Sequence, residues 1–194
     1  MAARIYLSRD AAAQALGADE TAAALQVAAA AKGTSITLTR VGSRGMVWLE
    51  PLVEVEDASG QRIAYGPVTA GDVPGLVQAG LFDTASHPLR LGRVEDMPWF
   101  AQQQRLTFAR VGVIDPVSVD DYVAHGGFAG LKRALGMSGA EIVQEVLESG
   151  LRGRGGAAFP TGIKWRTVLE QHSLQKYVVC NADEGDSGTF SDRM

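Results

Sequence analysis

The sequence predicts an α/β fold, and the first half of the chain carries the clearest evidence for it. Residues 4–7 form a short β-like run, and the alanine-rich stretch 10–32 that follows is a strong helix former, interrupted near Gly17. Residues 35–41 then alternate polar and apolar side chains, which is typical of a half-buried strand. The predicted order is therefore strand, helix, strand.

A hairpin and a closing helix complete this unit. Residues 52–56 and 62–65 flank Asp-Ala-Ser-Gly at 57–60, and these residue types tolerate the backbone angles of a tight turn. We expect the closing helix at about residues 70–80. Two strands joined by a helix, a hairpin and a last helix predict a thioredoxin-like domain over residues 1–84.

The second half of the chain has a different character. From Thr84 to Met97 the sequence is irregular and contains proline, glycine and mixed charge, so we expect a linker over residues 85–110. A second domain, 111–194, follows. The chain stops at Met194 directly after a predicted strand and loop, and we therefore expect a truncated fragment of a longer subunit.

Two short helices are predicted near the start of this second domain. Ser118 begins a short helix that Gly126 ends, and Ser138 with Glu141 forms the pattern of a capping box before a helix that ends at Gly150. We expect these helices to be structural.

Composition excludes several classes of function. The chain has 194 residues, of which 46% are hydrophobic and 21% charged, with a formal net charge of −4, so it lacks the basic surface of a nucleic-acid-binding protein. Charges at Arg9 and Asp10 interrupt the start, and no apolar run is long enough for a membrane span. We expect a cytoplasmic protein. The single cysteine, Cys180, excludes an intramolecular disulfide and a four-cysteine metal or iron–sulfur site built from this chain alone.

The segment 150–165 is the first candidate for chemistry. It contains five glycines together with Arg152, Arg154 and Lys164. Glycines let backbone N–H groups approach an anion closely, and the cations supply charge there. A plain glycine-rich turn has the same composition, and the segment is neither a Rossmann fingerprint nor a P-loop. Both interpretations stay open at this point.

A second candidate lies near the end of the chain. We expect residues 176–180 to form a buried strand, which leads into Asn181, Asp183, Glu184 and Asp186. Carboxylates and an amide at the carboxyl end of a strand are typical of a ligand crevice in α/β proteins. The alternative is a solvated acidic turn.

Residues 149–165 and 176–193 closely resemble the flavin- and NADH-binding region of the 51-kDa-type subunit. That subunit is shared by respiratory complex I, NAD-reducing hydrogenases and NAD-dependent formate dehydrogenases. The resemblance extends back through residues 115–122 and 126–128. It implies the start of an FMN-binding α/β domain, with FMN and NAD as cofactors. It also implies a [4Fe–4S] cluster in the full-length subunit that none of these residues ligates.

The first half of the chain indicates which of these three enzyme classes the chain resembles most. A thioredoxin-like domain fused ahead of the flavin module is similar to the β subunit of NAD-dependent formate dehydrogenase, and residues 40–55 resemble it particularly well. In cluster-bearing relatives this turn contains Cys-x-Gly-x-Cys, whereas Ser43 and Val47 stand at those places here. Neither residue replaces a thiolate ligand to a [2Fe–2S] centre. We expect a cluster-free scaffold or docking surface.

The resemblance implies roles for residues of the first candidate segment. Arg154, Gly155 and Gly156 correspond to FMN contacts, with the backbone near the flavin. Lys164 corresponds to a cation at the same cofactor, and Phe159 to a ring that stacks against the dinucleotide.

It implies roles for the second segment as well. Asn181, Asp183 and Glu184 correspond to hydrogen-bonding partners of the flavin or its ribityl chain. Asp186 stands where complex I relatives carry glutamate near the nicotinamide. Ala158 replaces a glycine that is common in the motif, which weakens the correspondence there.

Other residues are expected to be structural. We predict that Leu151, Ile163 and Trp165 anchor a core and that Cys180 is a small buried hydrophobe. His125 and His172 lack the spacing of a metal or catalytic pair, and Arg152 fits either a cofactor contact or a solvated cap. We expect no acid–base catalytic residue and no metal ligand.

The function implied by the resemblance is that of a diaphorase, an oxidoreductase subunit that exchanges hydride between FMN and NAD and relays single electrons through iron–sulfur clusters. Its expected partners in a formate dehydrogenase are NAD(H), a catalytic α subunit with molybdenum or tungsten, and a small thioredoxin-like [2Fe–2S] γ subunit. The alternatives are a diaphorase subunit of an NADH:quinone oxidoreductase or of an NAD-reducing hydrogenase. For this fragment alone, which we expect to be inactive, the alternative is a docking or assembly module.

Overall fold

The computed structural model describes residues 2–181, which divide into two compact units with the boundary between His125 and Gly126. The strands are β1 Ala3–Ser8, β2 Ile36–Val41, β3 Val53–Glu56, β4 Arg62–Tyr65 and β5 Arg90–Arg93. The α-helices are α1 Ala11–Ala15, α2 Ala18–Ala31, α3 Val73–Gln78, α4 Pro98–Ala101, α5 Val119–Ala124, α6 Ala129–Ala134, α7 Gly139–Glu148 and α8 Thr161–Glu170. Short 3₁₀ turns cover Val47–Leu49, Leu81–Asp83 and Val94–Asp96.

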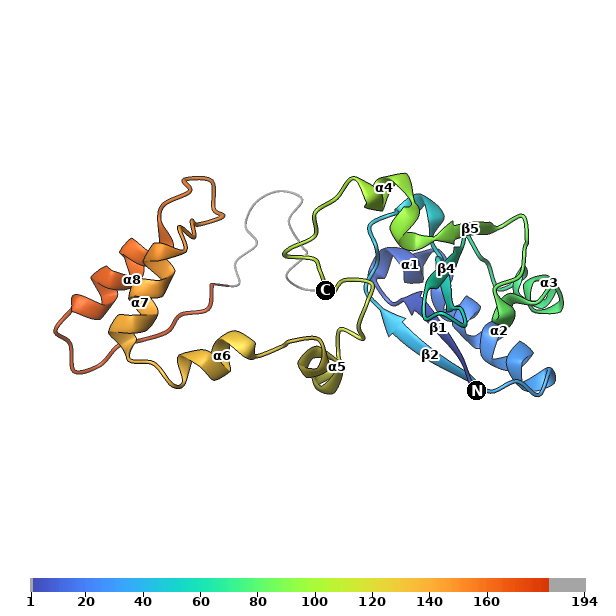
Figure 1. The fold of residues 1–194 in the computed structure, drawn as a ribbon, viewed down its shortest axis with the longest axis horizontal. Helices are drawn as coiled ribbons and strands as arrows, with labels where there is room; N and C mark the ends of the chain where they lie inside the picture. Colours follow the sequence, from blue (N-terminus) through green and yellow to red (C-terminus); the bar gives the residue numbers. More distant parts are fainter. Residues whose placement is uncertain (1, 182–194) are drawn as a thin grey trace. The chain divides into compact units, whose positions relative to one another are not determined.

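One sheet organises the first unit (Figure 1). Its strand order is β2-β1-β3-β4-β5, with β1 parallel to β2 and every other neighbouring pair antiparallel. The parallel pair is joined through α1 and α2, which break at Gly17 as predicted, and α3 follows the β3–β4 hairpin. The predicted α/β class and thioredoxin-like order of elements are therefore confirmed.

The alternation along the strands gives the sheet two different faces. One face packs against α1, α2 and α3 and forms the main hydrophobic core. Its fully buried strand residues are Ile5, Leu7, Val53, Val55 and Tyr65. Because neighbouring residues of a strand point to opposite faces, the residues between these lie on the second face.

A buried carboxylate dominates that second face. Glu54 is 2% exposed and accepts hydrogen bonds at 2.8 Å from both Nε and Nη2 of Arg44, while Nη1 of Arg62 lies 3.5 Å away. The Arg62 guanidinium also lies 3.3 Å from the centroid of the Tyr6 ring. A charge buried this deeply is tolerated only when it is paired and hydrogen-bonded, as it is here.

Part of the segment that we expected to be an irregular linker packs on this face. Residues 90–93 form the edge strand β5, and Val94 and Phe100 join a small second core with Met46 and Leu52. The chain is held there because the apolar and charged groups of the second face require cover. The expectation of irregular structure from Thr84 to Met97 is therefore wrong for β5. The domain limits 1–84, 85–110 and 111–194 stay a prediction.

Arg62 also fixes the chain beyond the expected linker. Its Nη1 and Nη2 donate to the carbonyl oxygens of Gly112 and Val113 at 2.6 and 2.8 Å. Gly112 has φ +77°, and a Cβ atom there would overlap the Arg44 side chain. Arg44 and Arg62 thus both bind Glu54 and also contact the backbone at Gly112.

Two helix caps in the second half follow the sequence prediction. Ser118 Oγ accepts from the N–H of Asp121 at 3.1 Å, and Ser138 and Glu141 form the reciprocal capping box that begins α7. Within residues 2–181, no helix is both long and apolar enough to cross a bilayer.

In the second unit, α7 and α8 lie side by side (Figure 1) and approach each other at a glycine. A Cβ atom on Gly162 would lie 2.7 Å from the backbone Cα and N of Leu147. Real side chains do not make contacts this short with backbone atoms, so the glycine sets the separation of the two helices.

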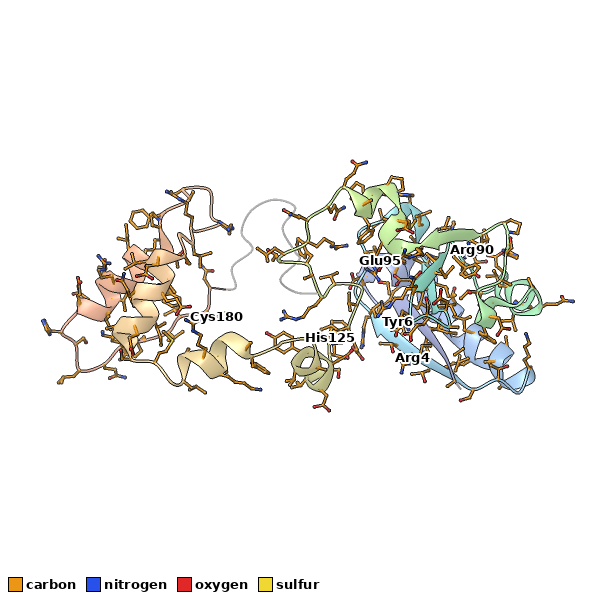
Figure 2. All side chains as sticks on the ribbon, viewed as in Figure 1. Arg4, Tyr6, Arg90, Glu95, His125 and Cys180 are labelled. Carbon is orange, nitrogen blue, oxygen red and sulfur yellow. The ribbon has the colours of Figure 1, made fainter. Side chains whose placement is uncertain are left out.

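Glu54→Gln is expected to lower the unfolding free energy of the first unit by about 3–5 kcal/mol, because it leaves Arg44 and Arg62 buried without a counter-charge. Denaturant unfolding measures this change. Arg4→Ala is the control, since it removes only the exposed pair that Arg4 forms with Glu56 at 3.2 Å (Arg4 is labelled in Figure 2), and it should cost less than about 1 kcal/mol. Equal losses in the two variants would contradict this assignment.

Gly162→Ala is expected to force α8 away from α7. Overpacking against backbone costs about 1–3 kcal/mol, which outweighs the gain of about 1 kcal/mol in helix propensity. Faster amide hydrogen exchange in α8 measures the effect. Gly130→Ala in α6, where a Cβ meets nothing within 4 Å, is the control and should not accelerate exchange in its own helix. Unchanged exchange in Gly162→Ala would show that the helices can adjust.

Candidate functional site

The glycine-rich segment forms a loop that joins α7 to α8 and is closed at its base. The N–H of Gly153 donates to the carbonyl of Phe159 and the N–H of Thr161 donates to that of Leu151, both at 2.9 Å. These bonds and an antiparallel bridge between Arg152 and Pro160 make a short hairpin-like base. Residues 154–158 form its tip.

The backbone of the tip is unusual. Gly156 has φ +93°, and Ala158 has φ +49° although it carries a Cβ atom. A left-handed conformation costs a non-glycine residue about 1–2 kcal/mol. Position 158 is the one where the related motif commonly has glycine, and the structure gives the physical reason for that preference.

Arg152 holds the tip at this strained residue. Its Nη1 donates to the carbonyl oxygen of Ala158 at 2.9 Å, and its own carbonyl accepts from Nη1 of Arg154 at 3.1 Å. A hydrogen bond from a charged donor contributes about 1.5–3 kcal/mol, less when it is exposed, which is comparable with the cost at Ala158. Sequence reasoning left the role of Arg152 open, because no sequence pattern signals this contact across the loop.

The tip offers donors and positive charge. Among residues 2–181, the N–H groups of residues 154–157 meet no protein acceptor. Between residues 150 and 165 the chain carries two arginines and a lysine and has no aspartate or glutamate. Free amides beside cations and the first turn of a helix suit a bound anion, such as the phosphate of a nucleotide cofactor.

An aromatic ring lies beside this positive segment. Lys164 Nζ, in the second turn of α8, lies 5.7 Å from the centroid of the Phe159 ring. Phe159 is 45% exposed, so one part of the ring is available for contact. Arg154, Gly155, Gly156, Phe159 and Lys164 all belong to this one loop and helix start, and all are accessible. The donor set fits an anionic, planar group.

The second predicted cluster is described only in part. Asn181 is exposed, whereas Asp183, Glu184 and Asp186 lie outside the described residues. Their roles at the site therefore stay predictions.

Three expectations about the surroundings are wrong. Residues 176–180 form no strand and are exposed, since no strand among residues 2–181 pairs with their backbone. Cys180, labelled in Figure 2, is exposed and free rather than buried. Leu151, Ile163 and Trp165 are 44–47% exposed rather than anchored in a core.

Lys176 instead binds the end of α8. Its Nζ donates to the carbonyls of Val168 and Leu169 at 2.7 and 3.3 Å. A cation at this position satisfies free carbonyl groups and complements the helix dipole. The chain after α8 is thus tied to the helix by a side chain rather than by a strand.

The turn that carries cysteines in cluster-bearing relatives is closed by polar contacts. Ser43 Oγ donates to Glu50 at 2.8 Å, and the N–H of Ser43 donates to Asp10 at 2.6 Å. Glu50 also accepts from the N–H of Leu52 at 2.9 Å. Within residues 2–181, no group of three or more His, Cys, Asp or Glu side chains is placed to hold a metal ion.

Burial raises the pKa of Glu50 above that of a free glutamate, although the hydrogen bonds from Leu52 and Ser43 oppose the shift. Because the folded-state pKa exceeds the unfolded one, this group contributes most to stability at acidic pH. The contribution is lost as the pH rises through the folded-state pKa.

Comparison with known proteins relates this region to a family. Residues 146–194 match the Nuo51 FMN-binding domain. The NADP-reducing hydrogenase subunit HndC of Solidesulfovibrio fructosivorans is 55% identical over 92 residues, which are 47% of this chain and 19% of that protein. An NADH-quinone oxidoreductase subunit of Rhizobium meliloti (strain 1021) is 52% identical over 85 residues, which are 43% of this chain and 20% of that protein.

A solved structure is similar to part of the chain. The thioredoxin-like [2Fe–2S] ferredoxin from Aquifex aeolicus is 17% identical, with a TM-score of 0.38, and the match covers 47% of this chain and 97% of the ferredoxin. The matches to the two curated relatives span only 19% and 20% of their own length. The loop tip and α8 lie within the part of the chain that matches the Nuo51 FMN-binding domain.

Proposed function

We propose that this chain is part of a diaphorase-type electron-transfer subunit that binds FMN and exchanges electrons with NAD(H). The observation that supports this proposal best is the tip of the α7–α8 loop. It presents backbone amides that meet no acceptor among residues 2–181, together with positive charge and no acidic residue, inside the segment that matches an FMN-binding domain.

In this proposal the protein binds and orients, and the cofactor supplies the redox chemistry. The amides of Gly155 and Gly156 and the charge of Arg154 and Lys164 hold the anionic and polar edges of FMN. Phe159, with its exposed ring, stacks against the dinucleotide. When bound, FMN links the two-electron chemistry of NAD to one-electron carriers.

The acidic segment has the complementary role. Asn181 would donate and accept hydrogen bonds at the flavin or its ribityl chain, and Asp183 and Glu184 would accept them. Asp186 would contact the nicotinamide with a shorter side chain than glutamate. No residue of the chain is required to act as a general acid or base. A [4Fe–4S] cluster of the full-length subunit is held by residues outside 1–194.

The proposed context is a cytoplasmic, NAD-dependent formate dehydrogenase. It rests on the thioredoxin-like unit that precedes the flavin segment in the same chain and on the turn with Ser43 and Val47 in place of cysteines. The partners would be a molybdenum- or tungsten-containing α subunit and a [2Fe–2S] γ subunit. A hydrogenase or a quinone reductase would use the same flavin module, as the names of the relatives indicate.

The first unit acts in this proposal as a scaffold or docking surface. Trp48 and Trp99 are 58% and 48% exposed and make an edge-to-face contact with ring centroids 5.3 Å apart. Exposed tryptophans held in a fixed pair are common at protein interfaces.

Gly156→Trp tests the flavin site in the full-length subunit. The variant should lose bound yellow flavin and NADH-driven dye reduction, because an indole at φ +93° strains the backbone and fills the tip. Gly60→Trp is the control, since it places the same side chain at a glycine of φ +82° in the β3–β4 turn. It should retain both properties. An active Gly156→Trp enzyme would exclude the loop as the flavin site.

Purification of the native complex tests the context. We expect the full-length subunit to co-purify with a protein that contains a molybdopterin site. The purified complex should catalyse formate-dependent NAD reduction. Recovery with a hydrogenase subunit would replace formate dehydrogenase by a hydrogenase, and recovery with quinone reductase subunits would replace it by a quinone reductase. Either result would leave the flavin proposal intact.

A further inference from the structure

We propose that Arg152 is the positioning residue of the flavin loop, acting on the cofactor through the shape of the tip rather than by direct contact. The inference rests on the proposed FMN site. It concerns a residue whose role neither its sequence pattern nor the relatives' names assign.

The contacts of Arg152 connect the base of the loop with its tip. Its backbone bridges to Pro160 in the base, and its guanidinium donates to the carbonyl of Ala158 in the tip. Its carbonyl accepts from the guanidinium of Arg154. One residue therefore contacts both ends of the tip and the cation expected to bind the cofactor.

The conformation of Ala158 explains why such a contact is needed. With φ +49° and a Cβ atom, Ala158 would relax to a right-handed or extended conformation if nothing held it. Relaxation would turn the peptide units of residues 156–158 and change where their N–H groups point. The hydrogen bond from Arg152 to the Ala158 carbonyl fixes the orientation of that peptide unit.

The arrangement also assigns different tasks to the two arginines. The hydrogen bonds of Arg152 run within the loop, across its mouth. Among the described residues, Arg154 donates one hydrogen bond, to the carbonyl of Arg152, so most of its N–H donors are left for a ligand. Arg154 is thus suited to the ligand and Arg152 to the loop that carries it.

Arg152→Met tests the proposal, because it keeps the apolar stem and removes the donor. In the full-length subunit the FMN dissociation constant should rise about tenfold, which corresponds to about 1.4 kcal/mol. Arg152→Lys should restore most of the affinity, since one donor suffices for the Ala158 carbonyl. Arg166→Met, which removes a neighbouring exposed cation from α8, is the matched control and should leave FMN affinity unchanged.

A double-mutant cycle with Arg154→Met separates positioning from direct contact. If Arg152 acts by placing Arg154 and the tip, the two substitutions are strongly non-additive, and Arg152→Met adds little to Arg154→Met. Fully additive losses would overturn the proposal, as would an Arg152→Met variant that binds FMN as well as Arg166→Met does.

Amide hydrogen exchange without FMN gives an independent readout. Gly153 and Thr161 donate the hydrogen bonds of the loop base, and both amides should exchange faster in Arg152→Met, while the amide of Ser149 at the end of α7 stays unchanged. Unchanged exchange at Gly153 and Thr161 would overturn the positioning role. Failure of the wild-type subunit to bind FMN would refute the proposed cofactor instead, and the exchange result would still decide the role of Arg152 in the loop.

Discussion

The close approach of α8 to α7 at Gly162 is the constraint on which the candidate site depends. A loop whose ends are fixed by two packed helices has little freedom at its base, so two backbone hydrogen bonds and one bridge are enough to close it. The short closed base then places residues 154–158 at an exposed tip. Gly162 therefore serves packing, whereas a Cβ atom at Gly155 or Gly156 of the tip would meet nothing within 4 Å, although the sequence presents all of them as one glycine-rich run.

A different constraint organises the first unit. Glu54 lies on a central strand and faces away from the main core, where its buried charge must be paired. Arg44 and Arg62 supply the pairing, and they carry the segments around Ser43 and Gly112 with them. One carboxylate thus determines where two irregular stretches of chain lie. The apolar residues of the second small core complete the cover that these arginines begin.

The sequence was informative wherever a local rule decides the structure. A short β-like run predicted β1, alternation predicted β2, and the turn residues 57–60 predicted the β3–β4 hairpin. Alanine content predicted α1 and α2, and the Ser138–Glu141 spacing predicted the cap of α7. Strand β5 escaped prediction because Arg-Leu-Gly-Arg shows no β propensity, and it becomes a strand only through pairing with β4. The opposite error occurred at residues 176–180, where a high β propensity has no partner strand among the described residues.

In the candidate site, too, local sequence rules predicted some features, whereas others depend on contacts in the folded chain. Residue types predicted the glycine-rich loop and its cations, because glycine and positive charge in one short segment are what anion binding by backbone amides needs, but a plain turn stayed the alternative. They did not identify Arg152, whose contact with Ala158 depends on the three-dimensional course of the loop. Roles that depend on the distance between the loop and the acidic segment stay predictions.

The turn at Ser43 is held by side-chain hydrogen bonds. A metal cluster would join its ligands through the metal, whereas here the hydroxyl of Ser43 and the carboxylate of Glu50 join the two sides of the turn directly. The remaining Glu50 oxygen binds the N–H of Leu52, so both oxygens of this buried carboxylate are satisfied. Because burial already raises the pKa of Glu50, loss of the Ser43 hydroxyl would favour the protonated acid further. The serine at this position therefore has a role of its own, which is to keep a buried carboxylate solvated by the protein.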